Sequence, residues 1–264
     1  MPKTPISYYG GKQNMLRHIL PNIPEHIIYT EAFFGGGAVF FSKKSVPSEI
    51  INDLNAQVMN FYSVCKTDFD ELKLKIEATI FARSTYSVAM TIYRMPHLFN
   101  KIQQAWAFYI ATNMGFGCRI GSWGLDKYGK RVKAFLNKKI IFDEAIPQRL
   151  ERTQIETGNA IKVIKQYDTP ETFHYIDPPY IETNMGHYAG YSISEYIELL
   201  KCLSQIKGKF LLSGFPNTIL DLYIQEFGWQ IKSFDQPKSA SKATLGKARS
   251  ARKTEVLVSN YQLK

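Results

Sequence analysis

The chain has 264 residues, of which 45% are hydrophobic and 21% are charged, proportions that are typical of a folded globular protein and exclude extensive disorder. Lys and Arg total 33 against 23 Asp and Glu, a net charge of +10. The sequence contains no apolar run of membrane-spanning length, and its first residues lack the apolar core of a secretion signal. Three widely spaced cysteines, Cys65, Cys118 and Cys202, predict neither a disulfide framework nor a metal site. We therefore expect a cytoplasmic protein without a metal ion or a membrane partner.

Short β-rich segments alternate with helical segments along most of the chain. Strands are predicted, in chain order, at residues 27–33, 49–51, 154–157, 173–176, 210–213, 229–234 and 255–260. Helices are predicted at residues 38–44, at several places within 55–113, and near 194–206 and 217–226. Residues 114–137 are rich in Gly and aromatic side chains, and we expect a loop or hairpin there. The alternation predicts an α/β fold with a doubly wound parallel sheet and an antiparallel edge at the C-terminus.

The helical stretch interrupts the alternation of strands and helices. We therefore predict that residues 55–150 form an inserted, mostly helical subdomain. Residues 1–54 and 151–264 would together form the main domain around the sheet.

Two segments carry the excess of positive charge. Residues 127–139 contain six Lys or Arg and no acid, and residues 232–253 contain seven Lys or Arg and one acid, so the remaining chain has a net charge of −2. A solvated surface would explain either segment alone. Two basic segments on a slightly acidic chain instead favour contact with a polyanion, and nucleic acid rather than a membrane. Because Gly129, Pro237 and Gly246 interrupt the segments, neither is predicted to be an amphipathic basic helix.

A run of three glycines, residues 35–37, follows the first predicted strand within the segment EAFFGGGAVFF. Glycine lets the backbone approach a ligand closely, and amides at the start of the next helix can donate hydrogen bonds. Alone, the run fits a tight crossover turn equally well. However, Asp53 follows the next predicted strand, and an acid at that edge of a doubly wound sheet can bind both hydroxyls of a ribose. The two features together predict a cofactor that contains a nucleoside.

The segment Asp177-Pro178-Pro179-Tyr180 follows another predicted strand. Proline has no amide donor and restricts the residue before it, so strand pairing ends at this point. The Asp177 carboxylate and nearby carbonyl groups are then predicted to point into the same cleft, with the Tyr180 ring beside them. Acceptors next to a flat ring suit a planar base with an exocyclic amine, whereas the bland alternative is a loop stiffened by proline.

These motifs resemble those of the Dam-type family of DNA adenine methyltransferases (D12 class, alpha group), which use S-adenosylmethionine. The matching segments follow the family's order over nearly the whole chain: residues 8–12 (YYGGK), 34–37 (FGGG), 52–55 (NDLN), 158–160 (GNA), 177–180 (DPPY) and 255–261 (EVLVSNY). The resemblance implies a Rossmann-like methyltransferase sheet with the DNA-recognition region in the inserted subdomain. It also implies site-specific methylation of the N6 amine of adenine in double-stranded DNA.

The resemblance assigns roles to individual residues. The implied cofactor-binding residues are Tyr8, Lys12, Phe34, Gly35, Gly36, Gly37, Asp53, Asn159 and Asp177. The implied catalytic residues are Asp177, Pro178, Pro179 and Tyr180. The family commonly has an acid at the position of Asn159, and the amide oxygen of Asn can accept a hydrogen bond in its place.

The chemistry of adenine explains why these residue types are needed. The adenine amine is a poor nucleophile because its lone pair is delocalised into the ring. Hydrogen bonds from the amine to the Asp177 carboxylate and the Pro178 carbonyl would favour a pyramidal nitrogen that can attack the methyl group. The amine cannot reach this geometry inside a stacked duplex, so the base must be flipped out, with Tyr180 stacking on it.

Contacts with DNA are predicted in and near the two basic segments. Phosphate contacts are expected for Lys127, Tyr128, Lys130, Arg131, Arg249, Arg252 and Lys253. Arg119 is expected either to contact a base or to have a structural role.

Two other functions remain open from the sequence. Methyltransferases that act on a protein glutamine also have a Pro-Pro-Tyr segment, but typically with Asn before it, so Asp177 and the basic segments favour DNA. A DNA-binding protein without catalysis is the other alternative. The sequence indicates neither the recognition site nor whether a companion restriction endonuclease exists, and a monomer is favoured.

Overall fold

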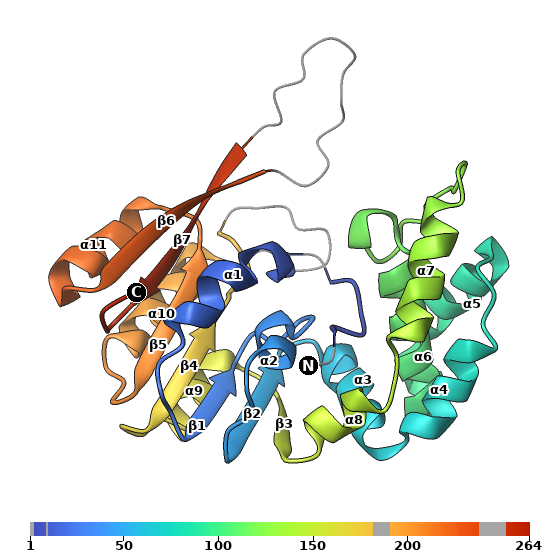
Figure 1. Cartoon of the computed structure of the whole chain (residues 1–264), viewed down its shortest axis with the longest axis horizontal. Helices are drawn as coiled ribbons and strands as arrows, with labels where there is room; N and C mark the ends of the chain where they lie inside the picture. Colours follow the sequence, from blue (N-terminus) through green and yellow to red (C-terminus); the bar gives the residue numbers. More distant parts are fainter. Residues whose placement is uncertain (1–2, 9, 182–190, 238–251) are drawn as a thin grey trace, which may run out of the picture.

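A seven-stranded sheet forms the centre of the computed structural model, which describes residues 3–8, 10–181, 191–237 and 252–264 (Figure 1). The strands are β1 (Ile28–Glu31), β2 (Ser48–Asp53), β3 (Thr153–Thr157), β4 (Thr172–Ile176), β5 (Lys209–Gly214), β6 (Gln230–Pro237) and β7 (Arg252–Ser259). Their order in the sheet is β3-β2-β1-β4-β5-β7-β6. The first five strands in this order are parallel, and β7 is antiparallel to both of its neighbours. The predicted doubly wound sheet with an antiparallel C-terminal edge is confirmed.

Alternate side chains of the central strands face two separate apolar layers, as the pleat of a strand requires. Phe173, Tyr175 and Leu211 belong to one buried cluster, and Ile176 and Leu212 belong to the other. The helices that contribute to the first cluster include α2 (Ala38–Ser42) and α3 (Ala56–Thr67), and those of the second are α9 (Ala160–Gln166), α10 (Ile193–Leu203) and α11 (Thr218–Phe227). Helices therefore cover both faces of the sheet.

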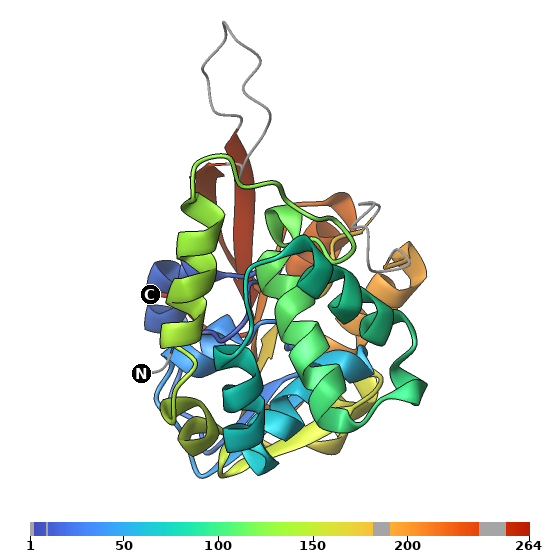
Figure 2. The ribbon, with the colours of Figure 1, turned by 90° about the vertical axis from the view of Figure 1, so that its right-hand side faces the viewer.

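The residues between β2 and β3 are mostly helical, as predicted. After α3 come α4 (Phe69–Glu77), α5 (Arg83–Arg94), α6 (Lys101–Met114), α7 (Lys130–Ile140) and α8 (Ala145–Leu150). Figure 2 shows these helices in front of the sheet. α3 contacts both β2 and β3, and its buried side chains share one apolar cluster with those of α6. Apolar packing is thus continuous from the sheet into the helical region, and the boundaries of the inserted subdomain stay a prediction.

The prediction of a loop or hairpin over residues 114–137 was wrong in its second half. An isolated β-bridge joins Gly115 to Trp123, but residues 130–140 form the helix α7. Gly129 adopts a left-handed conformation (φ 68°) immediately before the helix, so it starts the basic helix instead of interrupting it. The Asp126 carboxylate accepts hydrogen bonds from the amides of Arg131 (3.0 Å) and Val132 (2.9 Å) in the first turn. An acid outside the basic run therefore caps a helix of otherwise repelling charges.

Short helical elements outside the predicted ones complete the fold. They are η1 (Gln13–Met15), α1 (Leu16–Ile19), η2 (Leu20–Asn22), η3 (Pro96–Leu98) and η4 (Phe116–Cys118). These elements, α8 and α9 span seven residues or fewer, too few for a repeating apolar pattern to indicate a helix. Among the described residues, none of the helices combines the length and apolar content needed to cross a membrane.

Candidate active site

One cleft of about 400 Å³ lies where β1, β2 and β4 end, and its size is within the range of small-molecule sites. The twelve predicted cofactor-binding and catalytic residues all line it: Tyr8, Lys12, Phe34, Gly35, Gly36, Gly37, Asp53, Asn159, Asp177, Pro178, Pro179 and Tyr180. Parallel strands that pair side by side end at one edge, which brings together segments that are far apart in the sequence. In the described part of the chain, no group of three His, Cys, Asp or Glu side chains could hold a metal ion.

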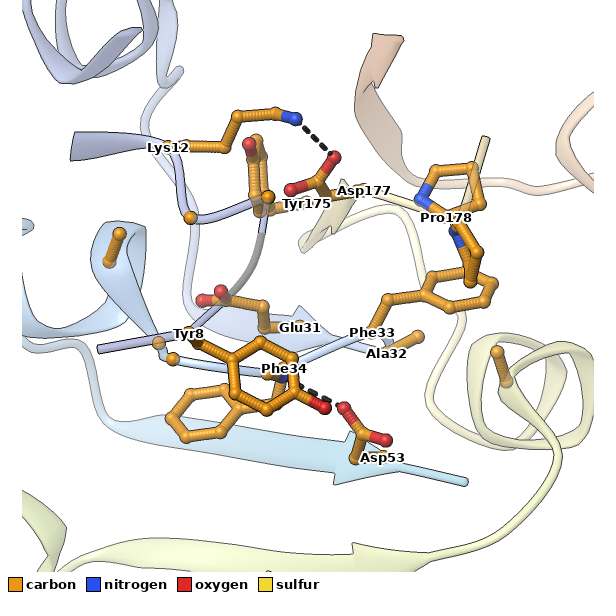
Figure 3. A pocket seen from close by; sticks show the side chains of 18 of the residues that line it. Tyr8, Lys12, Glu31, Ala32, Phe33, Phe34, Asp53, Tyr175, Asp177 and Pro178 are labelled. Carbon is orange, nitrogen blue, oxygen red and sulfur yellow. Dashed lines mark hydrogen bonds and ion pairs between the residues drawn. The ribbon is translucent and has the colours of Figure 1, made fainter. Parts of the chain in front are cut away.

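The glycine turn after β1 needs glycine for its conformation and for its packing. Gly35 (φ 48°) and Gly37 (φ 64°) adopt left-handed conformations that other residues rarely take. A Cβ atom at Gly35 would lie 2.8 Å from the Tyr8 ring, and one at Gly37 would lie 2.5 Å from the Phe34 ring. The turn is therefore a close-fitting floor of the cleft, with the Tyr8 ring packed against it (Figure 3).

Asp53, at the end of β2, fixes the same turn. One oxygen of its carboxylate accepts a hydrogen bond from the Gly35 amide (2.8 Å), and the other accepts one from the Asn55 amide (2.8 Å). Burial raises the pKa of this carboxyl group, and the two amide donors oppose the rise. An ionised carboxylate has about four acceptor positions, so two remain for hydroxyl groups of a ligand.

Asn159 begins α9 and uses its side-chain oxygen within the protein. Its Oδ1 atom accepts hydrogen bonds from the amides of Ile161 (2.9 Å) and Lys162 (3.2 Å), which caps the helix. The side chain therefore presents its amide nitrogen, a donor, to other partners. This differs from the acceptor role that we expected for Asn159 towards a cofactor.

Asp177 and Tyr180 meet at the ammonium group of Lys12. Lys12 Nζ lies 2.9 Å from Asp177 Oδ1 (Figure 3). It also donates a hydrogen bond to the Tyr180 hydroxyl at 2.7 Å. Burial would lower the pKa of Lys12, but the charge of Asp177 and the neighbouring Tyr180 and Glu255 raise it above its ordinary value. Burial raises the pKa of Tyr180 to about 12. Lys12 is therefore an ammonium ion, and Tyr180 is a neutral phenol.

Phe215 is a site residue that the sequence reasoning missed. Its ring stacks on Tyr180 with a centroid distance of 4.0 Å and an interplanar angle of 28°. On β7, Lys253 Nζ lies 5.1 Å from the Phe215 centroid and forms an ion pair with Glu255. Phe215 directly follows β5, at the same sheet edge as Asp177, and that position is the signal that could have found it.

Glu31 is the second missed residue, although it stands at the end of β1. Its Oε2 atom accepts hydrogen bonds from the Tyr29 hydroxyl (2.6 Å) and the Phe40 amide (3.1 Å). Burial raises the pKa of Glu31 to about 8, despite these two donors. Figure 3 shows its carboxyl group in the cleft, between Asp177 and Asp53. A buried acid in this position is suited to pair with a cationic group of a ligand.

The residues predicted to contact DNA have different surroundings. Lys127, Tyr128 and Lys130 are exposed together before and at the start of α7, and Tyr128 is 83% exposed. The Arg131 guanidinium instead donates to the carbonyl oxygens of Met114 (2.7 Å) and Gly115 (2.9 Å), and so holds the loop after α6. These positions leave the DNA contacts as predictions, with Arg131 also serving a structural role.

The remaining predicted DNA residues lie elsewhere on the surface. Arg119 is exposed in the loop before α7. Lys253 is paired with Glu255 on β7. Arg252 begins β7 with a side chain outside the described part of the structure, and Arg249 lies outside the described residues. In Figure 1, α7 lies on one side of the strand ends that form the cleft, and the end of β6 and the start of β7 lie on the opposite side.

Comparisons with known proteins agree with this geometry. Residues 8–233 match the family model of D12 class N6 adenine-specific DNA methyltransferases. Type II methyltransferase M1.LlaDCHI of Lactococcus lactis subsp. cremoris is 27% identical over 275 residues, 96% of this chain and 93% of its own. Type II methyltransferase M.MjaIII of Methanocaldococcus jannaschii is 26% identical, over 97% of this chain and 98% of its own. Precorrin 8W decarboxylase of Methanobacterium thermoautotrophicum has a TM-score of 0.40 and 9% identity over 98% of each chain, too weak a likeness to support an argument.

Proposed function

Because the chain belongs to the D12 class of N6 adenine-specific DNA methyltransferases and methylates adenine in DNA site-specifically, we propose that its cleft binds S-adenosylmethionine beside an adenine flipped out of duplex DNA. One observation carries this proposal. The glycine turn with Asp53 and the segment Asp177–Tyr180 face a single cleft, so a donor and an acceptor can meet there. The described residues of one chain form this cleft, which supports action as a monomer.

The residues on the β1–β2 side of the cleft fit the methyl donor. Asp53 keeps two acceptor positions for the ribose hydroxyls, and the glycine turn lets a ligand approach the backbone closely. Glu31 would pair with the ammonium group of the methionine part. Phe33 and Tyr191, whose rings meet edge to face at 6.1 Å, add apolar walls. When bound, S-adenosylmethionine supplies a methyl group activated by its positive sulfur.

The residues on the β4 side fit the acceptor. The Asp177 carboxylate and the Pro178 carbonyl would accept hydrogen bonds from the two hydrogens of the adenine amine. These bonds favour the pyramidal nitrogen that carries a lone pair, and they strengthen as the nitrogen becomes positively charged. Holding two reactants in this orientation supplies most of the acceleration. The surplus proton leaves the nitrogen only after the new bond has formed and then passes to Asp177 or to solvent, so the reaction needs no strong base beforehand.

Tyr180 would hold the flipped base by stacking. A base inside the duplex presents only its edges, so its amine must leave the stack to reach Asp177. Phe215 covers one face of the Tyr180 ring and Lys12 binds its hydroxyl, so the ring is fixed before DNA arrives. A rigid ring binds a base with little loss of side-chain entropy.

The exposed cations near α7 and on the β6–β7 side would bind the DNA backbone. Lys130 begins α7 on one side of the strand ends, and Arg252 begins β7 on the other. This placement supports a duplex that runs across the mouth of the cleft, with positive charge on both sides. The relatives' description as Type II methyltransferases supports a role in restriction–modification, with an endonuclease of the same specificity as the companion.

The test is a methylation assay with mapping. Genomic DNA is incubated with the protein and S-adenosylmethionine, and modified adenines are located by sequencing. We expect N6-methyladenine within one short recognition sequence, and no product with the variant Asp177→Ala. Methyl transfer to protein instead of DNA, or methylation without a sequence preference, would contradict the proposal.

A further inference from the structure

We propose that Lys12 is a positioning residue for methyl transfer, which keeps Asp177 ionised and holds its carboxylate and the Tyr180 hydroxyl in one arrangement before DNA binds. This inference rests on the proposed function, in which Asp177 accepts the adenine amine. It gives Lys12 a role on the acceptor side of the cleft, beyond a place at the border of the cofactor.

A single atom, the ammonium nitrogen of Lys12, contacts both acceptor-side residues, Asp177 and Tyr180. Lys12 Nζ is 2.9 Å from Asp177 Oδ1 and 2.7 Å from the Tyr180 hydroxyl. The side chain of Lys12 is only 5% exposed and that of Asp177 is 19% exposed. An ion pair with so little water around it is weakly screened, so the ammonium strongly affects the charge of the carboxylate.

Without this ammonium, the surroundings of Asp177 would oppose its negative charge more strongly. The groups that act on its charge are Lys12 before η1, Glu31 on β1, Tyr175 on β4, Tyr180 in its own segment, and Glu255 and Lys253 on β7. Two of these, Glu255 and Glu31, are acids, and each opposes a negative charge on Asp177 when it is itself ionised. Lys253 is already paired with Glu255, so its charge is largely compensated. Burial also raises the pKa of Asp177, and Lys12 is the main group that lowers it.

A protonated Asp177 would be a poor acceptor. Protonation places a hydrogen on one carboxyl oxygen, and that oxygen then donates instead of accepting. The adenine amine, which offers only hydrogens before it reacts, would lose the partner that becomes most favourable as positive charge develops. Keeping Asp177 ionised therefore affects the rate of transfer more than the binding of either substrate.

Lys12 is held by a segment that also contacts the helical region. The Ser7 amide donates to Asn113 Oδ1 at 3.0 Å, and Asn113 lies on α6. Further along, the Gly11 amide donates to the Tyr8 carbonyl at 3.2 Å, and the Met15 amide donates to the Lys12 carbonyl at 2.9 Å. These bonds fix the backbone on both sides of Lys12, from which its side chain extends to Asp177 and Tyr180.

The experiment measures the rate of a single methyl transfer against pH. Wild-type protein, Lys12→Met and Lys12→Arg are saturated with S-adenosylmethionine and with a duplex that contains the mapped site, and quenched between pH 5.5 and 9. Lys138→Met serves as a matched control, because its ammonium lines the same cleft but donates to the Thr4 carbonyl (2.9 Å) instead of Asp177. Binding of S-adenosylmethionine to each variant is measured separately.

We expect the acidic limb of the Lys12→Met profile to move upward by at least about one pH unit, with the rate rising about tenfold per unit below the midpoint. The difference in methyl-transfer rate between Lys12→Met and wild-type protein should then become smaller as the pH increases. Lys12→Arg should keep the wild-type limb because it keeps the charge, and Lys138→Met should keep it because Asp177 is unaffected.

Other outcomes would overturn the inference. If the methyl-transfer rate of Lys12→Met falls by the same factor at every pH, Lys12 does not act through Asp177. The same follows if Lys12→Met loses only affinity for S-adenosylmethionine. If Lys12→Met does not fold, Lys12→Arg decides, since an upward shift despite the retained charge would refute the role. If wild-type protein methylates the mapped adenine while the variants show no shift, only this inference fails. If wild-type protein forms no methyladenine, the proposed function fails instead.

Discussion

Binding of S-adenosylmethionine is expected to release about 0.9 of a proton from Glu31 at pH 7. Burial raises the pKa of Glu31 to about 8, so about nine tenths of this group is protonated at pH 7 before the ligand binds. An ammonium group beside it favours the ionised form and lowers its pKa. The proton therefore leaves when the ion pair forms. At pH 9 only about 0.1 of a proton remains to be released.

Isothermal titration calorimetry in buffers with different ionisation enthalpies measures the net number of protons released, and the difference between the wild-type protein and Glu31→Gln isolates the part that comes from Glu31. The observed binding enthalpy changes with the buffer in proportion to the number of protons released. Glu31→Gln is the matched control, because it keeps the size of the side chain and removes the titration. A binding enthalpy that does not depend on the buffer at pH 7 in the wild-type protein, or an equal dependence in Glu31→Gln, would refute the assignment of Glu31 to the ammonium.

Four further predictions concern stability, stacking and DNA affinity. Asp53→Ala leaves the buried amide of Gly35 and the partly buried amide of Asn55 without acceptors. We therefore expect the unfolding free energy to fall by about 1–3 kcal/mol for the buried amide and by less for the other, measured by urea denaturation without ligand. Tyr180→Ala should lose about 1–3 kcal/mol of base stacking in DNA titrations. Tyr180→Phe should lose little of it, because the aromatic ring remains. Phe215→Ala should weaken DNA binding by about 0.5–1.5 kcal/mol, because the Tyr180 ring loses the ring that it stacks on. A variant as active as wild type would refute that role. Replacing Lys127 and Lys130 by Ala should reduce the slope of log affinity against log salt by about 0.9 for each true phosphate contact.

The fold and the centre of the site followed from local patterns in the sequence. Asp53 and Asp177 each follow a short β-rich run, and parallel strands that pair in one sheet end at one edge, so their convergence in a single cleft was predictable. The stack of Phe215 on Tyr180 was not predicted, because the position of Phe215 after a predicted strand does not by itself indicate that this strand, β5, pairs beside β4.

Other differences have local physical causes. The Gly and aromatic content of residues 114–137 indicated a loop or hairpin, but Asp126 caps the first turn of α7 and makes a helix favourable. Arg131 was interpreted only by its charge, whereas its planar donors match the two carbonyl oxygens exposed at the end of α6. Charge patterns along a sequence do not distinguish a phosphate partner from a carbonyl partner within the protein.

The order β2-β1-β4 within the sheet separates the two halves of the reaction by a constant distance. The ends of β2 and β4 are two strand widths apart, about 10 Å, and backbone hydrogen bonds to β1 maintain that spacing. A protein with this strand order can change its methyl acceptor by altering the few residues after β4. The turn held by Asp53 can meanwhile bind the same methyl donor. Within the segment between β2 and β3, the exposed loop before α7 can change with equally little effect on either strand end, whereas α3 packs on both strands. The sheet thus makes substrate choice, target choice and donor binding separable in evolution.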